Sequence, residues 1–90
     1  MLVSQRMRLD VLLHELRLFK SRSQAATAIE EGRIHVGGRS VKASRDIEAG
    51  ERFTIMGHAG ARTVEVLELP RKGMSKSAAH ALVRDVGERA

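Results

Sequence analysis

The chain has 90 residues, of which 42% are hydrophobic; this is enough for one domain with a modest core and argues against general disorder. Because cysteine is missing, a disulfide framework and a thiolate metal site are excluded. The net charge of +5 and a sequence pI of about 10.7 favour a polyanionic partner. Residues 1–5 are too few and too polar for a signal peptide, and no run is long enough to span a membrane, so we expect a cytoplasmic protein.

The charge is unevenly distributed along the chain. Residues 1–45 hold nine Lys/Arg against four Asp/Glu, residues 46–70 hold two against five, and residues 71–90 hold five against two. A surface that is charged only for solubility mixes its signs, whereas here positive charge gathers in the parts expected to be helical. The pattern favours nucleic acid over an anionic membrane, since no expected helix has the bulky apolar face that membrane-surface binding uses.

Two short helices are predicted near the N-terminus. Four leucines at i, i+3, i+4 and i+7 form the apolar stripe of a first helix of about three turns. They are Leu9, Leu12, Leu13 and Leu16. Asp10 in the first turn suits the positive end of the helix dipole. Ser21 with Gln24 fits the capping-box pattern and predicts the start of a second helix, which Gly32 is placed to end.

A small antiparallel sheet is predicted to follow the helices. Residues 33–36 alternate polar and apolar side chains, and Gly37-Gly38 supplies the positive-φ pair of a two-residue hairpin turn before a return strand at 39–41. Residues 42–50 are expected to form a loop or irregular edge, with Ile47 as its anchor.

A second strand pair is predicted over residues 52–56 and 62–69, joined by a turn at 57–60. In the strand at 62–69, Val64 and Val66 share one parity while Leu67 and Leu69 share the other. Either a bulge or a strand buried on both faces would explain this change.

The C-terminal part is predicted to be helical. Pro70 stops the preceding strand, residues 71–73 form a basic link, and Ser75 is a suitable N-cap for a last helix. The apolar stripe of that helix is expected to be Ala79, Leu82, Val83 and Val86.

The predicted organisation is an N-terminal tail at 1–7, one domain at 8–70, and the basic link with its helix at 71–90. The fold class is α+β, with two N-terminal helices packed on a small, mainly antiparallel sheet.

A series of ordered positions resembles the S4 RNA-binding domain. The series begins with Arg8-Leu9-Asp10, continues with Ser21-Arg22-Ser23 and Ala25, runs through Ile29…Gly32-Arg33-Ile34…Val36…Gly38 to Val41, and extends through Lys42…Ser44 to Gly50-Glu51…Phe53-Thr54-Ile55. It spans about residues 8–56. The resemblance implies the S4-like (αL-type) fold, a compact helix–helix–sheet unit.

The rest of the chain resembles the small stand-alone members of this family. These are the fifteen-kilodalton heat-shock protein and the RqcP-type factor of bacterial ribosome quality control. The resemblance implies binding to a dissociated large ribosomal subunit that still holds peptidyl-tRNA. Gly37 stands where the family usually has Asn. The long basic tail of the heat-shock branch is missing, which favours the RqcP type.

The expected start of the second helix is a candidate phosphate site. The first turn of a helix exposes unpaired N–H groups, Arg22 offers a bidentate contact and Lys20 a point charge. The alternative is that Ser21 only caps the helix and Arg22 is solvated; the basic surroundings and the resemblance favour RNA contact. The candidate RNA-binding residues are Arg8, Lys20, Ser21, Arg22, Ser23, Gln24, Arg39, Lys42 and Arg45, and a candidate second contact consists of Arg71, Lys72 and Lys76.

Other kinds of chemistry have little support in the sequence. The only aromatic residues, Phe19 and Phe53, are expected in the core, which favours recognition of folded RNA by shape and backbone over stacking of single-stranded bases. The four histidines are scattered without ligand-like spacing, so no metal or other cofactor is expected. No catalytic order of residues stands out, and we expect no enzyme.

Three functions compete at this stage. The first is a non-catalytic, monomeric protein that binds structured RNA (large-subunit ribosomal RNA, tRNA or both) in quality control of stalled or dissociated large subunits. The second is a helix-turn-helix DNA-binding protein that reads bases with Arg22, Gln24 and Thr27. The third is an RNA-binding accessory subunit of an RNA-modifying enzyme.

Overall fold

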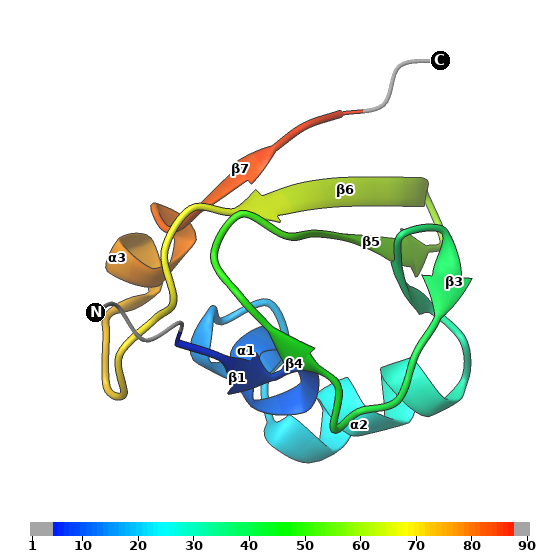
Figure 1. Cartoon of the computed structure of the whole chain (residues 1–90), viewed down its shortest axis with the longest axis horizontal. Helices are drawn as coiled ribbons and strands as arrows, with labels where there is room; N and C mark the ends of the chain where they lie inside the picture. The colour runs from blue at the N-terminus through cyan, green and yellow to red at the C-terminus, as the bar shows by residue number, and fades with distance from the viewer. Residues whose placement is uncertain (1–4, 88–90) are drawn as a thin grey trace.

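The computed structural model describes residues 5–87, in which two helices lie against one face of an antiparallel sheet (Figure 1). The helices are α1 (Leu9–Glu15), α2 (Arg22–Glu30) and α3 (Lys76–His80). The strands are β1 (Met7–Arg8), β2 (Ile34–Val36), β3 (Arg39–Ser40), β4 (Asp46–Ile47), β5 (Arg52–Gly57), β6 (Gly60–Val66) and β7 (Val83–Asp85). Five strands form one sheet in the order β3-β2-β5-β6-β7, and β1 pairs with β4 in a separate ladder. The predicted α+β class is confirmed.

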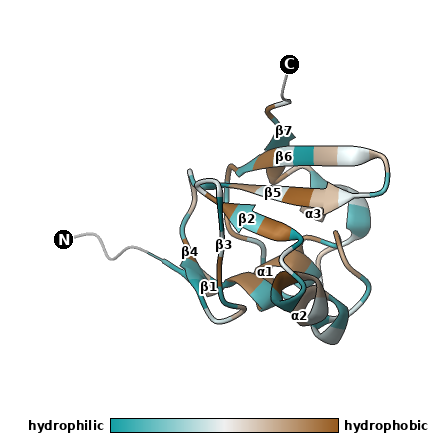
Figure 2. Cartoon of the chain, turned by 90° about the vertical axis from the view of Figure 1, so that its right-hand side faces the viewer, coloured by the Kyte–Doolittle hydropathy of each residue, from teal (hydrophilic) through white to brown (hydrophobic). Residues whose placement is uncertain are grey.

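The core lies between the two helices and the sheet. All four leucines of the predicted stripe are completely buried, although α1 has seven residues and therefore about two turns instead of the expected three. Ala25 and Ala28 of α2 are also fully buried, and their small side chains let α2 pack closely on α1. Phe53 of β5 is the largest buried side chain. Figure 2 shows the hydrophobic segments of α1, β2 and β5.

The predicted ends of α2 are confirmed. Ser21 is the N-cap, and its Oγ accepts a hydrogen bond of 3.0 Å from the Gln24 N–H. At the other end Gly32 has φ +78, and the Arg33 N–H donates to the Ala28 carbonyl at 2.9 Å. This six-to-one bond is the mark of a Schellman motif, in which the left-handed residue is usually glycine.

Gly32→Ala is therefore expected to lower the free energy of unfolding by about 1 kcal/mol, because an L side chain is strained in the left-handed region. The new Cβ meets no atom within 4 Å, so backbone strain is the whole effect. Gly57→Ala is the matched control, since its Cβ makes only an ordinary contact of 3.7 Å with the Gly60 carbonyl. Urea unfolding of both variants measures the difference. Equal losses in the two would show that the conformation of Gly32 is not what stabilises this helix end.

The turns of the two predicted hairpins are confirmed. Gly37 and Gly38 have φ +63 and +81 between the antiparallel strands β2 and β3. Gly57 pairs with Gly60 at the end of the β5–β6 hairpin. Ile47, the expected anchor of the following loop, is fully buried and pairs with Met7 in the β1–β4 ladder. Met7, which the sequence placed in the tail, thus already belongs to a strand.

The change of parity in the strand at 62–69 coincides with a contact of the kind found in a bulge, one of the two expected causes: the Leu67 and Glu68 N–H groups both donate to the Leu82 carbonyl, at 2.7 and 3.4 Å. β6 begins at Gly60 and ends at Val66, with Val64 and Val66 fully buried. Leu67 lies beyond the strand and is 48% exposed. The change of parity therefore falls at the end of the strand.

The prediction of a long C-terminal helix is wrong beyond His80. Ser75 caps α3 as expected, since its Oγ accepts a hydrogen bond from the Ala78 N–H at 3.2 Å. Helix α3 then ends after five residues, and Val83, expected on its apolar stripe, begins β7 and pairs with Val66. The free edge of β6 explains the error, because its backbone groups gain hydrogen bonds that a helix would not supply. None of the three described helices is long and apolar enough to cross a membrane.

Candidate nucleic-acid interface

A buried carboxylate joins the starts of α1 and α2. Asp10 is 3% exposed and accepts hydrogen bonds from Arg8 Nε at 3.1 Å and Arg8 Nη2 at 3.0 Å. It also accepts from Arg22 Nε at 3.3 Å and from the Val11 N–H at 2.8 Å. We call Arg8, Asp10 and Arg22 the Asp10 cluster. Two arginines predicted separately to bind RNA are thus held by one carboxylate, which the sequence had assigned only to the helix dipole.

The segment before β4 covers the N-terminal end of α1. The Leu9 N–H donates to the Arg45 carbonyl at 2.8 Å, and the Asp10 N–H donates to the Ala43 carbonyl at 3.2 Å. These backbone bonds use two of the N–H groups that the first turn of a helix leaves unpaired, so they are closed to a ligand. They also fix β1 and β4 beside each other, with Arg8 opposite Asp46.

The electrostatics of the Asp10 cluster favour the charged forms of Asp10 and Arg8. Burial by itself raises the pKa of the Asp10 carboxyl, but hydrogen bonds from Arg8, Arg22 and the Val11 N–H outweigh burial and hold that pKa below its ordinary value. The same hydrogen bond with Asp10 raises the pKa of Arg8. The guanidinium groups are still accessible, because the side chains of Arg8 and Arg22 are 45% and 55% exposed.

The lowered pKa of Asp10 predicts how its contribution to stability depends on pH. A carboxyl whose pKa is lower in the folded state stabilises the fold fully above the unfolded-state pKa, here 3.8, and loses this effect as the pH falls through the folded-state pKa. The difference in unfolding free energy between wild type and Asp10→Asn should therefore be constant above about pH 5 and narrow below about pH 4. Urea unfolding at a series of pH values measures it. A difference that narrows instead near neutral pH would contradict this role.

The other residues predicted at the start of α2 are close to the Asp10 cluster but differ in whether their side chains are already hydrogen-bonded within the protein. The Ser21 hydroxyl caps the helix, where its oxygen accepts a hydrogen bond from the Gln24 N–H; a contact of this side chain with RNA stays a prediction. Ser23, Gln24 and Lys20 are exposed. Arg22 uses its Nε for Asp10, and within residues 5–87 no hydrogen bond is made by its two terminal nitrogens. Those nitrogens are available to a bidentate phosphate contact.

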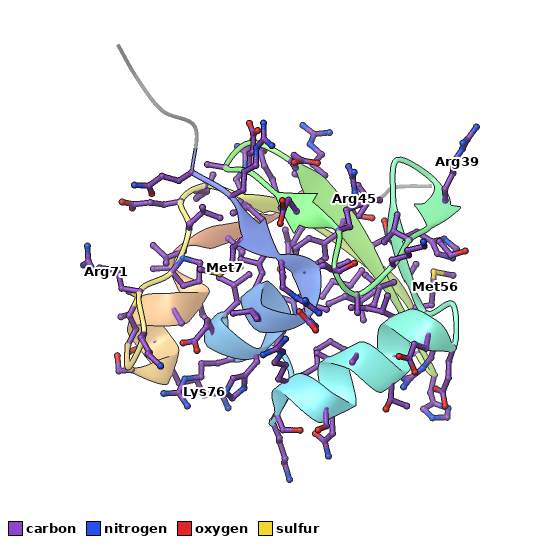
Figure 3. All side chains as sticks on the ribbon, turned by 60° about the horizontal axis from the view of Figure 1, so that its bottom comes forward. Met7, Arg39, Arg45, Met56, Arg71 and Lys76 are labelled. Atoms are coloured by element: carbon purple, nitrogen blue, oxygen red, sulfur yellow. The ribbon has the colours of Figure 1, made fainter. Side chains whose placement is uncertain are left out.

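The predicted cations beyond α2 spread along the molecule. Arg45 lies near α1, but its Nη2 donates to Glu51 Oε1 at 3.1 Å. Lys42 is exposed and, together with Glu30, lines a hollow of about 490 Å³ at the C-terminal end of α2. Figure 3 shows Arg39 pointing away from the body of the molecule, at the end opposite to Arg71 and Lys76. Of these three cations, only Lys42 lies beside α2, and none of them forms a salt bridge with Asp10.

The candidate second contact adjoins the first. Lys72 lines a hollow together with Arg22, and Lys76 lines another, of about 420 Å³, together with Lys20. Arg71 is exposed on the same segment. Two groups of cations that are about fifty residues apart in sequence are thus neighbours in the fold, on the side where α3 lies (Figure 3).

Arg17 fastens the C-terminal segment to the end of α1. Its Nη2 donates to the Met74 carbonyl at 2.8 Å, and its own carbonyl accepts a hydrogen bond of 3.3 Å from His80 Nε2. Arg17 has φ +63, a conformation that usually belongs to glycine at the end of a helix. This role of Arg17 was not predicted, and nothing in its spacing from Met74 or His80 in the sequence indicates it.

The fifteen cations among the described residues fall into two classes. The first, entirely arginine, forms salt bridges with carboxylates and consists of Arg6, Arg8, Arg22, Arg33, Arg45, Arg52, Arg62 and Arg84. The second has no such partner within residues 5–87 and consists of Arg17, Lys20, Arg39, Lys42, Arg71, Lys72 and Lys76. A cation of the second class would not have to give up a salt bridge within residues 5–87 in order to bind a phosphate. In the same part of the chain, no group of three or more His, Asp or Glu residues is placed to hold a metal ion.

Comparison with known proteins gives one family. Residues 7–53 match the family model of the S4 domain. The RQC P-site tRNA stabilizing factor of Bacillus subtilis (strain 168) is 36% identical over 74 residues, which cover 82% of this chain and 86% of that protein. The Heat shock protein 15 homolog of Aeromonas salmonicida is 32% identical over 78 residues, or 87% of this chain, but the match spans only 59% of that longer protein.

A solved structure agrees with the fold. The trimeric structure of Vibrio cholerae Heat Shock Protein 15 superposes with a TM-score of 0.83 at 29% sequence identity. The match covers 91% of this chain and 83% of that chain. It therefore covers a larger share of this chain than the family model, which matches residues 7–53.

Proposed function

Because this chain belongs to the S4 domain family, we propose that it is a non-catalytic protein that binds structured RNA on the large ribosomal subunit. Its ligands are large-subunit ribosomal RNA, tRNA or both, and its task is quality control of stalled or dissociated large subunits. The names of two relatives support this proposal: the Bacillus subtilis relative is named for stabilizing P-site tRNA, and the Aeromonas salmonicida relative is named as a heat shock protein. A ribosomal partner places the protein in the cytoplasm.

The Asp10 cluster is the observation that carries the proposal. It presents two guanidinium groups from the starts of two helices, and the buried carboxylate limits the freedom of both. Lys20 adds a cation that has no salt-bridge partner among the described residues. Arginines held in a fixed arrangement are suited to phosphate groups whose spacing is also fixed, as in a folded RNA.

The apolar surface supports recognition through the backbone and shape of RNA. Phe53 is 1% exposed and belongs to the core, and Phe19 is partly buried and packs against the same core. Phe53 is therefore closed to a base, and Phe19 alone, which lines two surface hollows, does not make the row of aromatic side chains on which single-strand binding proteins stack successive bases. Binding is therefore expected to depend mainly on phosphate contacts and to weaken steeply as salt is raised.

Lys20→Ala and Arg22→Ala are each expected to reduce the salt slope of RNA binding by about one unit, because each removes one phosphate contact. Arg62→Ala is the matched control: it removes the same charge from an arginine that pairs with Asp85 on the far strands of the sheet. Filter binding to deproteinised large-subunit ribosomal RNA at several salt concentrations gives the slopes. Slopes that stay at the wild-type value in both variants would remove the start of α2 from the interface.

Cosedimentation with purified large ribosomal subunits tests the proposal as a whole. The protein is expected to sediment with the subunits at low salt, more strongly when they hold peptidyl-tRNA, and to be displaced by structured RNA. Duplex DNA of equal length and at equal salt should displace it poorly. Displacement by duplex DNA as efficient as by RNA would favour the helix-turn-helix alternative, in which α2 enters the major groove.

The proposed working form is a monomer that acts without an enzyme partner. The Vibrio cholerae relative is described as trimeric in its crystal structure, so the assembly state of this chain is a separate point to test. Sedimentation equilibrium of the full chain should give a mass close to 9.9 kDa. A threefold larger mass at micromolar concentration would overturn the monomer.

A further inference from the structure

A hollow of about 350 Å³ lies over the outer side of α1. We call it the α1 hollow; it is lined by Met7, Val11, His14, Glu15, Arg22 and Lys72. Val11, His14 and Glu15 lie at i, i+3 and i+4 and form a second stripe on α1, beside the leucines that face the core, and Met7 comes from the preceding strand β1. Figure 3 shows Met7 between α1 and the segment that carries Arg71. The walls are Arg22 from α2 and Lys72 from that segment, so the hollow is part of the proposed RNA-binding side.

One buried polar atom in this hollow has no partner. His14 Nδ1 is inaccessible to solvent and makes no hydrogen bond within the described residues. Most buried polar side-chain atoms are paired, so the desolvation cost of this atom is not offset by a hydrogen bond within the described residues. The histidine ring is otherwise half-buried and forms part of the lining.

This inference rests on the function proposed above and makes its ligand more specific. We propose that the α1 hollow holds one unpaired base of the bound RNA, with the neighbouring phosphates on Arg22 and Lys72. Met7 and Val11 supply apolar contacts for a flat ring, and histidine is one of the side chains on which RNA bases stack. The volume is at the small end of ligand pockets and suits one base better than a length of helix.

The charges around the hollow indicate where a base would bind and where a phosphate would bind. Glu15 lies in the lining and would repel a phosphate, but its carboxylate accepts a hydrogen bond from an exocyclic amino group. The preferred base is therefore one that carries such a group, and uracil is disfavoured. Lys72 and the terminal nitrogens of Arg22 have no internal partner among the described residues and flank the opening with positive charge.

Two RNA hairpins of equal phosphate count test this inference. One carries a single bulged cytidine, and the other carries an abasic residue at the same place. The full chain is expected to bind the cytidine hairpin roughly tenfold more tightly, the size of one base-stacking contact. His14→Ala should remove most of this preference, because it removes the stacking ring, whereas Glu15→Gln, which keeps only a weaker acceptor, should lower the affinity for the cytidine hairpin towards that for a uridine hairpin. Both variants should leave the affinity for the abasic hairpin within about twofold. A bulged uridine should lie between the two hairpins.

Glu68→Gln is the matched control for Glu15→Gln, because it removes the same charge from an exposed residue outside the hollow. It should leave the preference for cytidine intact. Thermal unfolding shows whether His14→Ala is folded, and Glu15→Gln tests the hollow independently if it is not. Equal binding of the cytidine and abasic hairpins by the wild type would overturn the base site while the proposed function stands. Failure to bind either hairpin at low salt would overturn both.

Discussion

Asp10→Asn is expected to weaken RNA binding by about tenfold, although it makes the protein more positive by one charge. Added positive charge alone strengthens binding to a polyanion. Here the buried carboxylate holds Arg8 through two hydrogen bonds and Arg22 through one. Without it both long side chains regain rotational freedom, and ordering them on the RNA then costs affinity.

Asp85→Asn is the control for this prediction. Asp85 is also a carboxylate paired with an arginine, at 2.8 Å from Arg62 Nε, but it is exposed and lies on the edge strand β7. Its replacement makes the same change in net charge and should leave RNA affinity equal or slightly higher. Filter binding at one salt concentration compares the two variants. If Asp10→Asn binds RNA as tightly as Asp85→Asn, the buried carboxylate does not organise the interface.

Leu12→Ala is expected to lower the free energy of unfolding by about 2–5 kcal/mol. Leu12 is completely buried between the helices and the sheet, so truncation leaves a cavity that a packed core closes only in part. A small domain has about 5–15 kcal/mol of stability in total, and this one substitution removes a large part of it. In thermal unfolding the loss should appear as a clearly lower Tm.

Leu67→Ala is the matched control, since it removes the same atoms from a leucine that is 48% exposed. Its effect on the free energy of unfolding should be below about 1 kcal/mol. Urea unfolding measures both losses. If the free energy of unfolding falls with urea concentration at the same slope in the two variants, their free energies can be compared directly. If both leucines give the same small loss, the side of α1 that carries Leu12 is not the core side.

The local parts of the fold could be predicted because their signals lie within a few residues. The leucine spacing identified the buried side of α1, and Ser21 and Gly32 marked both ends of α2. The glycine pair at 37–38 identified a hairpin turn because both positions need positive φ. In each case, the backbone conformation depends on the residues themselves and hardly on their tertiary neighbours.

The C-terminal strand could not be predicted because its conformation depends on a distant partner. Val83 fits both an apolar helix stripe and a strand, and only the free edge of β6 decides between them. The same holds for Arg17, whose partners Met74 and His80 come from the far end of the chain. No pattern within a short window contains this information.

The Asp10 cluster was only partly visible in the sequence. Arg8 and Arg22 were predicted as separate phosphate contacts, and their sharing of one carboxylate is a tertiary feature. One signal pointed to it: an acidic residue in the motif Arg8-Leu9-Asp10, within a segment that is otherwise strongly basic. A carboxylate in such a place opposes polyanion binding unless it positions the cations around it.

The C-terminal segment adds to the interface through its docking. Because Arg17 fastens residues 74–80 to the end of α1, Lys72 and Lys76 come to lie beside the turn between α1 and α2. Cations from the two basic parts of the chain are thereby brought together at the start of α2, since Lys76 lines one hollow with Lys20 and Lys72 lines another with Arg22. We propose that the cations at the start of α2 and those of the C-terminal segment act as one continuous RNA-binding surface.

The salt dependence of RNA binding tests this account most directly. Two triple variants remove the same charge; one replaces Arg8, Lys20 and Arg22 by alanine, and the other replaces Arg52, Arg62 and Arg84 on the sheet. With deproteinised large-subunit ribosomal RNA, the first variant should lose about two to three units of the slope of log K against log salt, while the second keeps the wild-type slope. Equal losses in the two variants would mean that RNA responds only to net charge, and would contradict an interface built at the meeting of α1 and α2.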